Sequence, residues 1–273
     1  MISVWLALNA LVSNPTQPSF VQKVIGNLAA FIFTPVAIEC QLAISSIIVL
    51  AIMIGVIDRR SFSSLGFTRS GIISDTFWGM LAGTAIVVCY SALMLLLGYY
   101  WFYGLNRSYS LVTSLALFLF ASISEESVFR GYILQTVEAR WGTKVAVAVS
   151  SLAFGLYHIW YWKAKIPILI FRVFYDGMIG VPLAAAYLVR RRLWMPIGLH
   201  WGYDLAWSLF AYDAFGNPPG LVIGVAGPAF FTGGRFGAPA SPLLYMSMIL
   251  ASLILIQFAK RPIQQPIKTD IPK

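Results

Sequence analysis

The sequence predicts an all-α protein, a polytopic transmembrane helical bundle of about seven to eight spans. Hydrophobic residues fill 59% of the 273 positions and charged residues only 11%, which is far from the composition of a soluble domain. The mean hydropathy of +0.79 agrees, and the apolar residues occur in long runs that short polar loops separate. Cys40 and Cys89 both fall in such runs without a CxxC spacing, which indicates membrane-packing thiols rather than a disulfide or metal site.

Seven apolar runs are predicted to be spans, because ~1.5 Å per helical residue must cover a hydrocarbon core of about 30 Å. They cover residues 28–57, 72–100, 111–137, 145–162, 166–189, 193–212 and 243–259. The stretch 216–242 contains too many Gly and Pro residues for a regular helix, so we expect a loop or a re-entrant element there.

The chain ends are predicted to lie outside this bundle of residues 28–259. Residues 1–12 are apolar but too short to span, which favours an interfacial segment within residues 1–27, and residues 260–273 form a polar tail.

The distribution of basic residues predicts the orientation in the membrane. If alternate loops share a side, one side and the C-terminal tail collect most of the 19 Lys and Arg residues. The positive-inside rule then places the C-terminus in the cytosol and accounts for the net charge of +9. Because no basic run is interleaved with aromatics in a polar segment, we expect a lipid bilayer as the partner and no nucleic acid. A bacterial plasma membrane is the predicted location, with the endoplasmic reticulum as the alternative.

Three charged residues interrupt the third run, where each ionised group costs at least a few kcal/mol. Glu126 and Arg130 are four residues apart and share a helix face, whereas Glu125 is turned away by roughly 100°. We expect Glu126 and Arg130 to neutralise each other and to leave Glu125 as a free carboxylate that faces a cavity. The alternative is that all three form a structural ion-pair cluster.

The two histidines of the chain, His158 and His200, both lie inside predicted spans. Asp204 follows His200 by four residues, so the two share a helix face and can hydrogen-bond or coordinate together. Counted from the predicted span ends, both histidines can lie at the depth of Glu125. Glu39 is a further intramembrane charge, and Arg172 and Asp176, again four apart, are predicted to be a structural pair.

A carboxylate, two imidazoles and a second carboxylate permit more than one chemistry. Glu125 can act as general base on a water with His158, while His200 and Asp204 position a carbonyl or stabilise an oxyanion. Alternatively, Glu125, His158, His200 and Asp204 are candidate ligands of a divalent metal such as zinc, although no HExxH is present. Intramembrane Glu, His and Asp also form proton relays, which keeps a proton-coupled transporter open.

Three stretches together resemble the motifs of the CPBP (Abi) family of intramembrane proteases, which includes the type II CAAX prenyl endopeptidases. Glu-Glu-x-x-x-Arg is similar to residues 125–130, Phe-x-x-x-His to 154–158, and His-x-x-x-Asn/Asp to 200–204. The resemblance covers roughly residues 65–242. The prenyl endopeptidases usually have Asn where this chain has Asp204, and an ionised Asp cannot donate to an oxyanion.

The resemblance implies an intramembrane endopeptidase with its catalytic domain in residues 28–259. Glu125 and His158 would activate the water, His200 and Asp204 would form the oxyanion side, and Glu126 and Arg130 would support them. The implied substrates are membrane-associated proteins or peptides, prenylated ones included. A non-catalytic bacteriocin-immunity or scaffold protein that retains these residues is the alternative within the family, and the metal question stays open.

Overall fold

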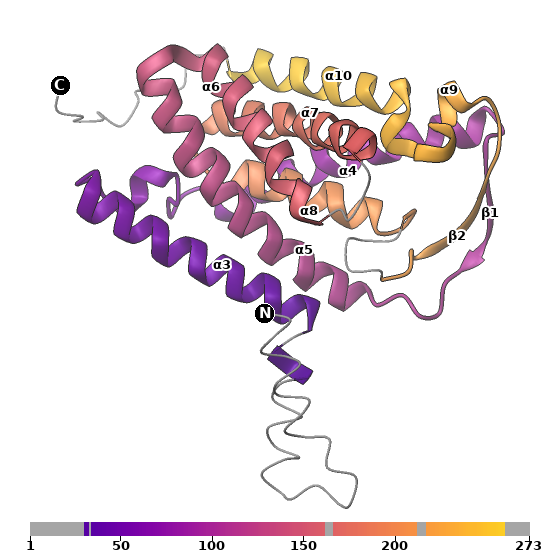
Figure 1. Cartoon of the computed structure of the whole chain (residues 1–273), viewed down its shortest axis with the longest axis horizontal. Coiled ribbons are helices and arrows are strands. Elements are labelled where there is room, and N and C mark those ends of the chain that lie inside the picture. The colour runs from indigo at the N-terminus through magenta and orange to yellow at the C-terminus, as the bar shows by residue number, and fades with distance from the viewer. Residues whose placement is uncertain (1–29, 33, 162–165, 212–216, 260–273) are drawn as a thin grey trace, which may run out of the picture.

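The computed structural model describes residues 30–32, 34–161, 166–211 and 217–259, and the predicted N-terminal segment and polar tail lie outside them. The all-α membrane fold class is confirmed, because helices dominate and five are long and apolar enough to cross a membrane. The helices are α3 (Pro35–Ile52), α4 (Ile72–Leu96), α5 (Leu111–Glu126), α6 (Gln135–Tyr157), α7 (Ile166–Arg190), α8 (Trp194–Trp207), α9 (Ala229–Thr232) and α10 (Pro242–Ala259) (Figure 1). The shorter helical turns and strands are η1 (Met53–Ile57), η2 (Phe62–Leu65), η3 (Ser127–Leu134), η4 (His158–Tyr161), η5 (Gly234–Phe236), η6 (Ala238–Ala240), β1 (Tyr100–Leu105) and β2 (Leu221–Val225).

The predicted runs correspond to these helices with two differences. The third and fourth runs form one helical stretch, Leu111–Tyr157, which breaks at Gly142 with φ 79° and ψ 168°. Glycine adopts this backbone conformation without a steric penalty. The sixth run is shorter than predicted: α8 has 14 residues, about 21 Å, and ends at Trp207. The chain turns there because the Ser208 and Leu209 carbonyls accept hydrogen bonds from Gly220 and Leu221.

The stretch 216–242 is not a regular helix, as predicted, but it contains a strand that the sequence did not indicate. β2 pairs with β1 in an antiparallel two-stranded sheet, from Tyr100 opposite Val225 to Leu105 opposite Leu221, with a bulge between Phe102 and Gly104. The ribbon lies at one end of the bundle, beside α9 (Figure 1). Pairing satisfies backbone groups that an irregular chain would leave open at this end.

Among the described residues, α4 and α8 pack most extensively against each other, and glycines make the close approach possible. Gly79 and Gly83 on α4 face α8, and Gly198 and Gly202 on α8 face α4. A Cβ added at Gly83 would collide with the Leu199 carbonyl oxygen, so the backbones are in contact. Small residues four apart are typical of helix pairs in membranes. This contact holds α8 in the bundle although α8 is too short to span.

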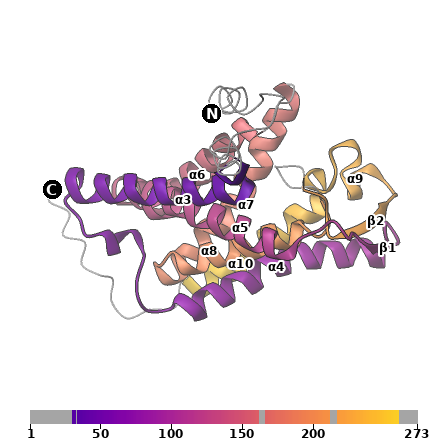
Figure 2. The same cartoon turned by 90° about the horizontal axis from the view of Figure 1, so that it is seen from below.

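Loops rich in arginine meet at the end opposite the β1–β2 ribbon (Figure 1, Figure 2). Arg191 pairs with Glu138, and Arg192 Nη1 lies 3.0 Å from Asp75 Oδ2. The Leu193 amide donates to the Gly66 carbonyl at 3.0 Å. The loops near residues 58–71, 138–144 and 190–193, which the alternation of spans predicts on one side, therefore lie together.

Candidate active site

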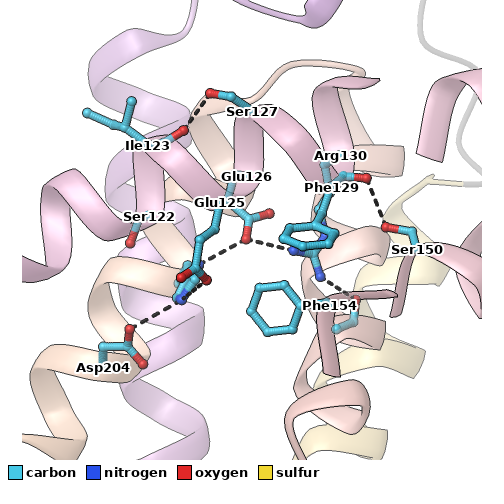
Figure 3. A network of polar contacts seen from close by, with 12 residues as sticks. Ser122, Ile123, Glu125, Glu126, Ser127, Phe129, Arg130, Ser150, Phe154 and Asp204 are labelled. Carbon is cyan, nitrogen blue, oxygen red and sulfur yellow. Dashed lines mark hydrogen bonds and ion pairs between the residues drawn. The ribbon is translucent and has the colours of Figure 1, made fainter. Parts of the chain in front are cut away.

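The predicted pair of Glu126 and Arg130 is present and fully buried. Arg130 Nη1 donates to Glu126 Oε1 at 2.8 Å and Nη2 donates to the Gly180 carbonyl of α7 at 3.1 Å (Figure 3). The guanidinium carbon also lies 4.6 Å from the centre of the Phe154 ring. This arginine therefore ties α5 and η3 to α6 and α7. Its helical stretch, η3, is a π-helix, a wide turn that occurs often at functional sites.

His200 of α8 lies between carboxylates that two helices supply. Its Nδ1 is 2.9 Å from Glu126 Oε1, and its Nε2 is 3.2 Å from Asp204 Oδ2, the partner predicted from the spacing of four. Glu126 Oε1 thus contacts both Arg130 and His200. The contact between Glu126 and His200 was not predicted, because a contact across two helices leaves no spacing signal in the sequence.

His158 approaches the same point from the end of α6. Its Nδ1 is 2.8 Å from the Phe154 carbonyl, which can only accept a hydrogen bond, so Nδ1 carries a proton. In the neutral imidazole, Nε2 then bears the lone pair, and it faces Glu125 Oε2 at 3.7 Å. The Phe154 ring packs against both imidazoles, with centroid distances of 4.7 Å to His158 and 5.6 Å to His200.

Glu125 Oε2 lies between the two imidazoles without a hydrogen-bond partner. It is 3.7 Å from His158 Nε2 and 3.8 Å from His200 Nε2, beyond hydrogen-bond distance from both. A water can lie about 2.8 Å from each of two atoms with this separation. The structure therefore brings together all six predicted site residues, Glu125, Glu126, Arg130, His158, His200 and Asp204.

A cavity of about 770 Å³ opens onto these groups. Glu125, His158, His200 and Asp204 line it, and toward the ribbon so do β2, Thr232, Gly234 and residues 236–239. The volume lies within the range of ligand pockets. At the ribbon, burial and a hydrogen bond with Tyr90 raise the pKa of Tyr100, which keeps this lining phenol neutral.

Three further charged residues line the cavity: Glu39, Arg172 and Asp176. The sequence indicated each of them, because each is a charged residue within an apolar run. The predicted structural pairing of Arg172 with Asp176 stays a prediction, and both side chains face the cavity. The Tyr175 and Tyr203 hydroxyls, 2.6 Å apart, also line it, and the sequence gave no sign of this pair because tyrosine is common in apolar runs.

Within the described part of the chain, no group of three or more His, Cys, Asp or Glu side chains is arranged to hold a metal ion. The ring nitrogens of His200 are both directed at carboxylate oxygens, and Nδ1 of His158 is held by a carbonyl.

The fold and the site define an integral membrane protein with a buried cluster of carboxylates and imidazoles that faces a cavity. Residues 107–206 match the model of the family described as type II CAAX prenyl endopeptidase Rce1-like, which is consistent with the CPBP family. The matched segment contains all three motifs, so the predicted resemblance is confirmed and the family is one of CAAX-type intramembrane proteases. Searches of curated proteins and of solved structures found no match.

Proposed function

We propose that the protein is an intramembrane endopeptidase that hydrolyses peptide bonds with a water activated by Glu125. The observation that carries the proposal is the position of Glu125 Oε2, which has no hydrogen-bond partner and lies 3.7 to 3.8 Å from two imidazole nitrogens at a cavity. A general base must have an open acceptor that a water can reach, and this oxygen has one.

In the first step, Glu125 takes a proton from the water while the water oxygen attacks the peptide carbonyl carbon. His158 Nε2, the acceptor nitrogen of that ring, accepts the second hydrogen of the water and so orients it. In the second step, the tetrahedral intermediate collapses, the carbon–nitrogen bond breaks, and protonated Glu125 gives its proton to the leaving amine. The products are a carboxylic acid and an amine, between which a proton moves to give the carboxylate and the ammonium group, and Glu125 returns to its initial state.

His200 stabilises the oxygen that gains negative charge in this scheme through the positive charge of its imidazolium. Both of its ring nitrogens face carboxylates, and only an imidazolium can donate from both. Glu126 fixes the ring at Nδ1, and Asp204 orients Nε2, so the aspartate acts as an acceptor rather than as a donor to the oxyanion. Electrostatic stabilisation of an oxyanion by one preorganised group typically contributes about 10²–10³-fold in rate.

The substrates that fit this site are proteins or peptides held at the membrane, lipidated ones included. Membrane-crossing helices supply part of the cavity lining, which places the site within reach of a substrate that is itself anchored in the bilayer. The arginine-rich end of the bundle would face the cytosol of a bacterial cell, together with the C-terminus.

Peptide cleavage by the purified full chain tests the proposal. Quenched peptides, prenylated and unmodified, are incubated with the wild type, with Glu125→Gln and His158→Ala, and with wild type treated with a chelator. We expect cleavage by the wild type, loss in both variants and no effect of chelation. Loss on chelation with rescue by zinc would replace the metal-free scheme, and equal cleavage by Glu125→Gln would refute the role of Glu125.

A further inference from the structure

The cavity contains a carboxylate that the scheme above does not use. Glu39 lies on α3, outside the segment that matches the family, and its side chain is only 3% exposed. It lines the cavity together with Glu125, His200 and Asp204 and lies within electrostatic range of all three. It has no hydrogen bond or ion pair to another described residue.

The position of Glu39 relative to Glu125 follows from one contact between helices. The Ser46 and Ser124 hydroxyls are 3.0 Å apart, and α3 and α5 run side by side in the same direction (Figure 1, Figure 2). Glu39 precedes Ser46 by seven residues, which is two helical turns or about 10 Å. It therefore lies at the level of Leu117, seven residues before Ser124, and both Glu39 and Leu117 line the cavity.

The charges of the cavity are unbalanced toward the acidic side. Four carboxylates line it, and the cationic side is supplied by Arg172 and the two histidines, of which His158 is neutral in the scheme above. With all four carboxylates ionised and His200 counted as an imidazolium, two negative charges would be left over. An excess of this kind inside low-dielectric walls attracts a cation. An unpaired carboxylate in such a place is costly until a partner arrives.

From this geometry we propose that Glu39 forms a subsite for a cationic side chain of the substrate, a lysine or an arginine. An extended peptide covers about 3.3 Å per residue. The rise of about 10 Å along the helices, from the level of Glu39 to that of Ser124 beside Glu125, therefore corresponds to roughly three residues. The inference rests on the proposed function and adds a preference to it. The enzyme favours peptides with a basic residue within about three positions of the cleaved bond.

Matched peptide pairs test the subsite, with Lys or Gln at each of the four positions on either side of the cleaved bond. The measured quantity is the ratio of kcat/KM for the Lys and Gln peptides. We expect a wild-type ratio of roughly tenfold or more at one position, as a hydrogen bond to a charged group supplies. Glu39→Gln should bring the ratio close to one. A third peptide, with Glu at that position, should be the preferred substrate of Glu39→Lys.

Asp58→Asn is the matched control, because it removes one carboxylate from the same helical segment at its far end. It should keep the wild-type ratio. Binding of the same peptides to Glu125→Gln, measured by fluorescence anisotropy, reports on the subsite without cleavage. A Lys preference in binding without any cleavage by the wild type would uphold the subsite and refute the proposed protease. Cleavage by the wild type with equal ratios in wild type and Glu39→Gln would overturn the subsite alone.

Discussion

Replacing Arg130 by Met should destabilise the protein strongly, because it leaves Glu126 as a buried charge with one partner fewer. Arg130 is 0% exposed and makes two charge-assisted hydrogen bonds, at 2.8 Å and 3.1 Å. Each such bond contributes about 1.5–3 kcal/mol, which gives roughly 3–6 kcal/mol in total. Removal of one partner from a buried ion pair costs about 3–5 kcal/mol, in agreement. His200 stays as a partner of Glu126, so we expect the lower half of this range.

Thermal unfolding in detergent, followed by tryptophan fluorescence or by loss of soluble protein, measures this effect. At about 2–4 °C per kcal/mol, Arg130→Met should lower the midpoint by roughly 6–18 °C. The double variant Glu126→Gln with Arg130→Met removes the unpaired charge and should regain part of the loss. Arg140→Met, at an exposed position on α6, should stay within about 0.5 kcal/mol of the wild type. A single variant as stable as the double variant would refute the reasoning.

Three other outcomes follow from the site and its packing. Glu125→Gln should lower the cleavage rate by about 10²–10⁴-fold while the unfolding midpoint stays close to that of the wild type, and a matching fall in stability would count against a catalytic role. Asp204→Asn should keep cleavage within about tenfold of the wild type, since an amide oxygen still accepts from His200, whereas Asp204→Ala should lose more. Gly83→Ala should cost about 1–3 kcal/mol or more by overpacking α4 against α8, with Gly55→Ala, where a Cβ meets nothing within 4 Å, as the neutral control in the same unfolding assay.

Helix geometry made the contacts within one helix predictable. Glu126 with Arg130 and His200 with Asp204 are each four residues apart, and a helix brings such residues onto one face whatever surrounds it. The apolar runs predicted the positions of the helices, because a single segment inside lipid can satisfy its backbone hydrogen bonds only as a helix.

The sequence could show that residues on different helices lie at compatible depths, but it could not predict which of them are in contact. The distances from Glu125 to His158 and His200 depend on how α5, α6 and α8 pack, and the predicted depths only allowed these groups to meet. The β1–β2 ribbon was missed because its aromatic residues, such as Trp101 and Phe102, continue an apolar run that also fits a helix end. The end of α8 was missed because apolar residues continue past Trp207, while the backbone turns to meet Gly220.

The length of α8 sets an order for the insertion of this chain into a membrane. A helix of 14 residues is too short to cross the bilayer alone, so it gains no stable position there by its own hydrophobicity. It becomes stable once Gly198 and Gly202 pack against the glycine-lined groove of α4. Because α4 precedes α8 in the chain, the groove exists in the membrane before α8 is synthesised. His200 therefore reaches Glu125 as a late step of assembly, and incomplete chains that lack α8 hold no finished site.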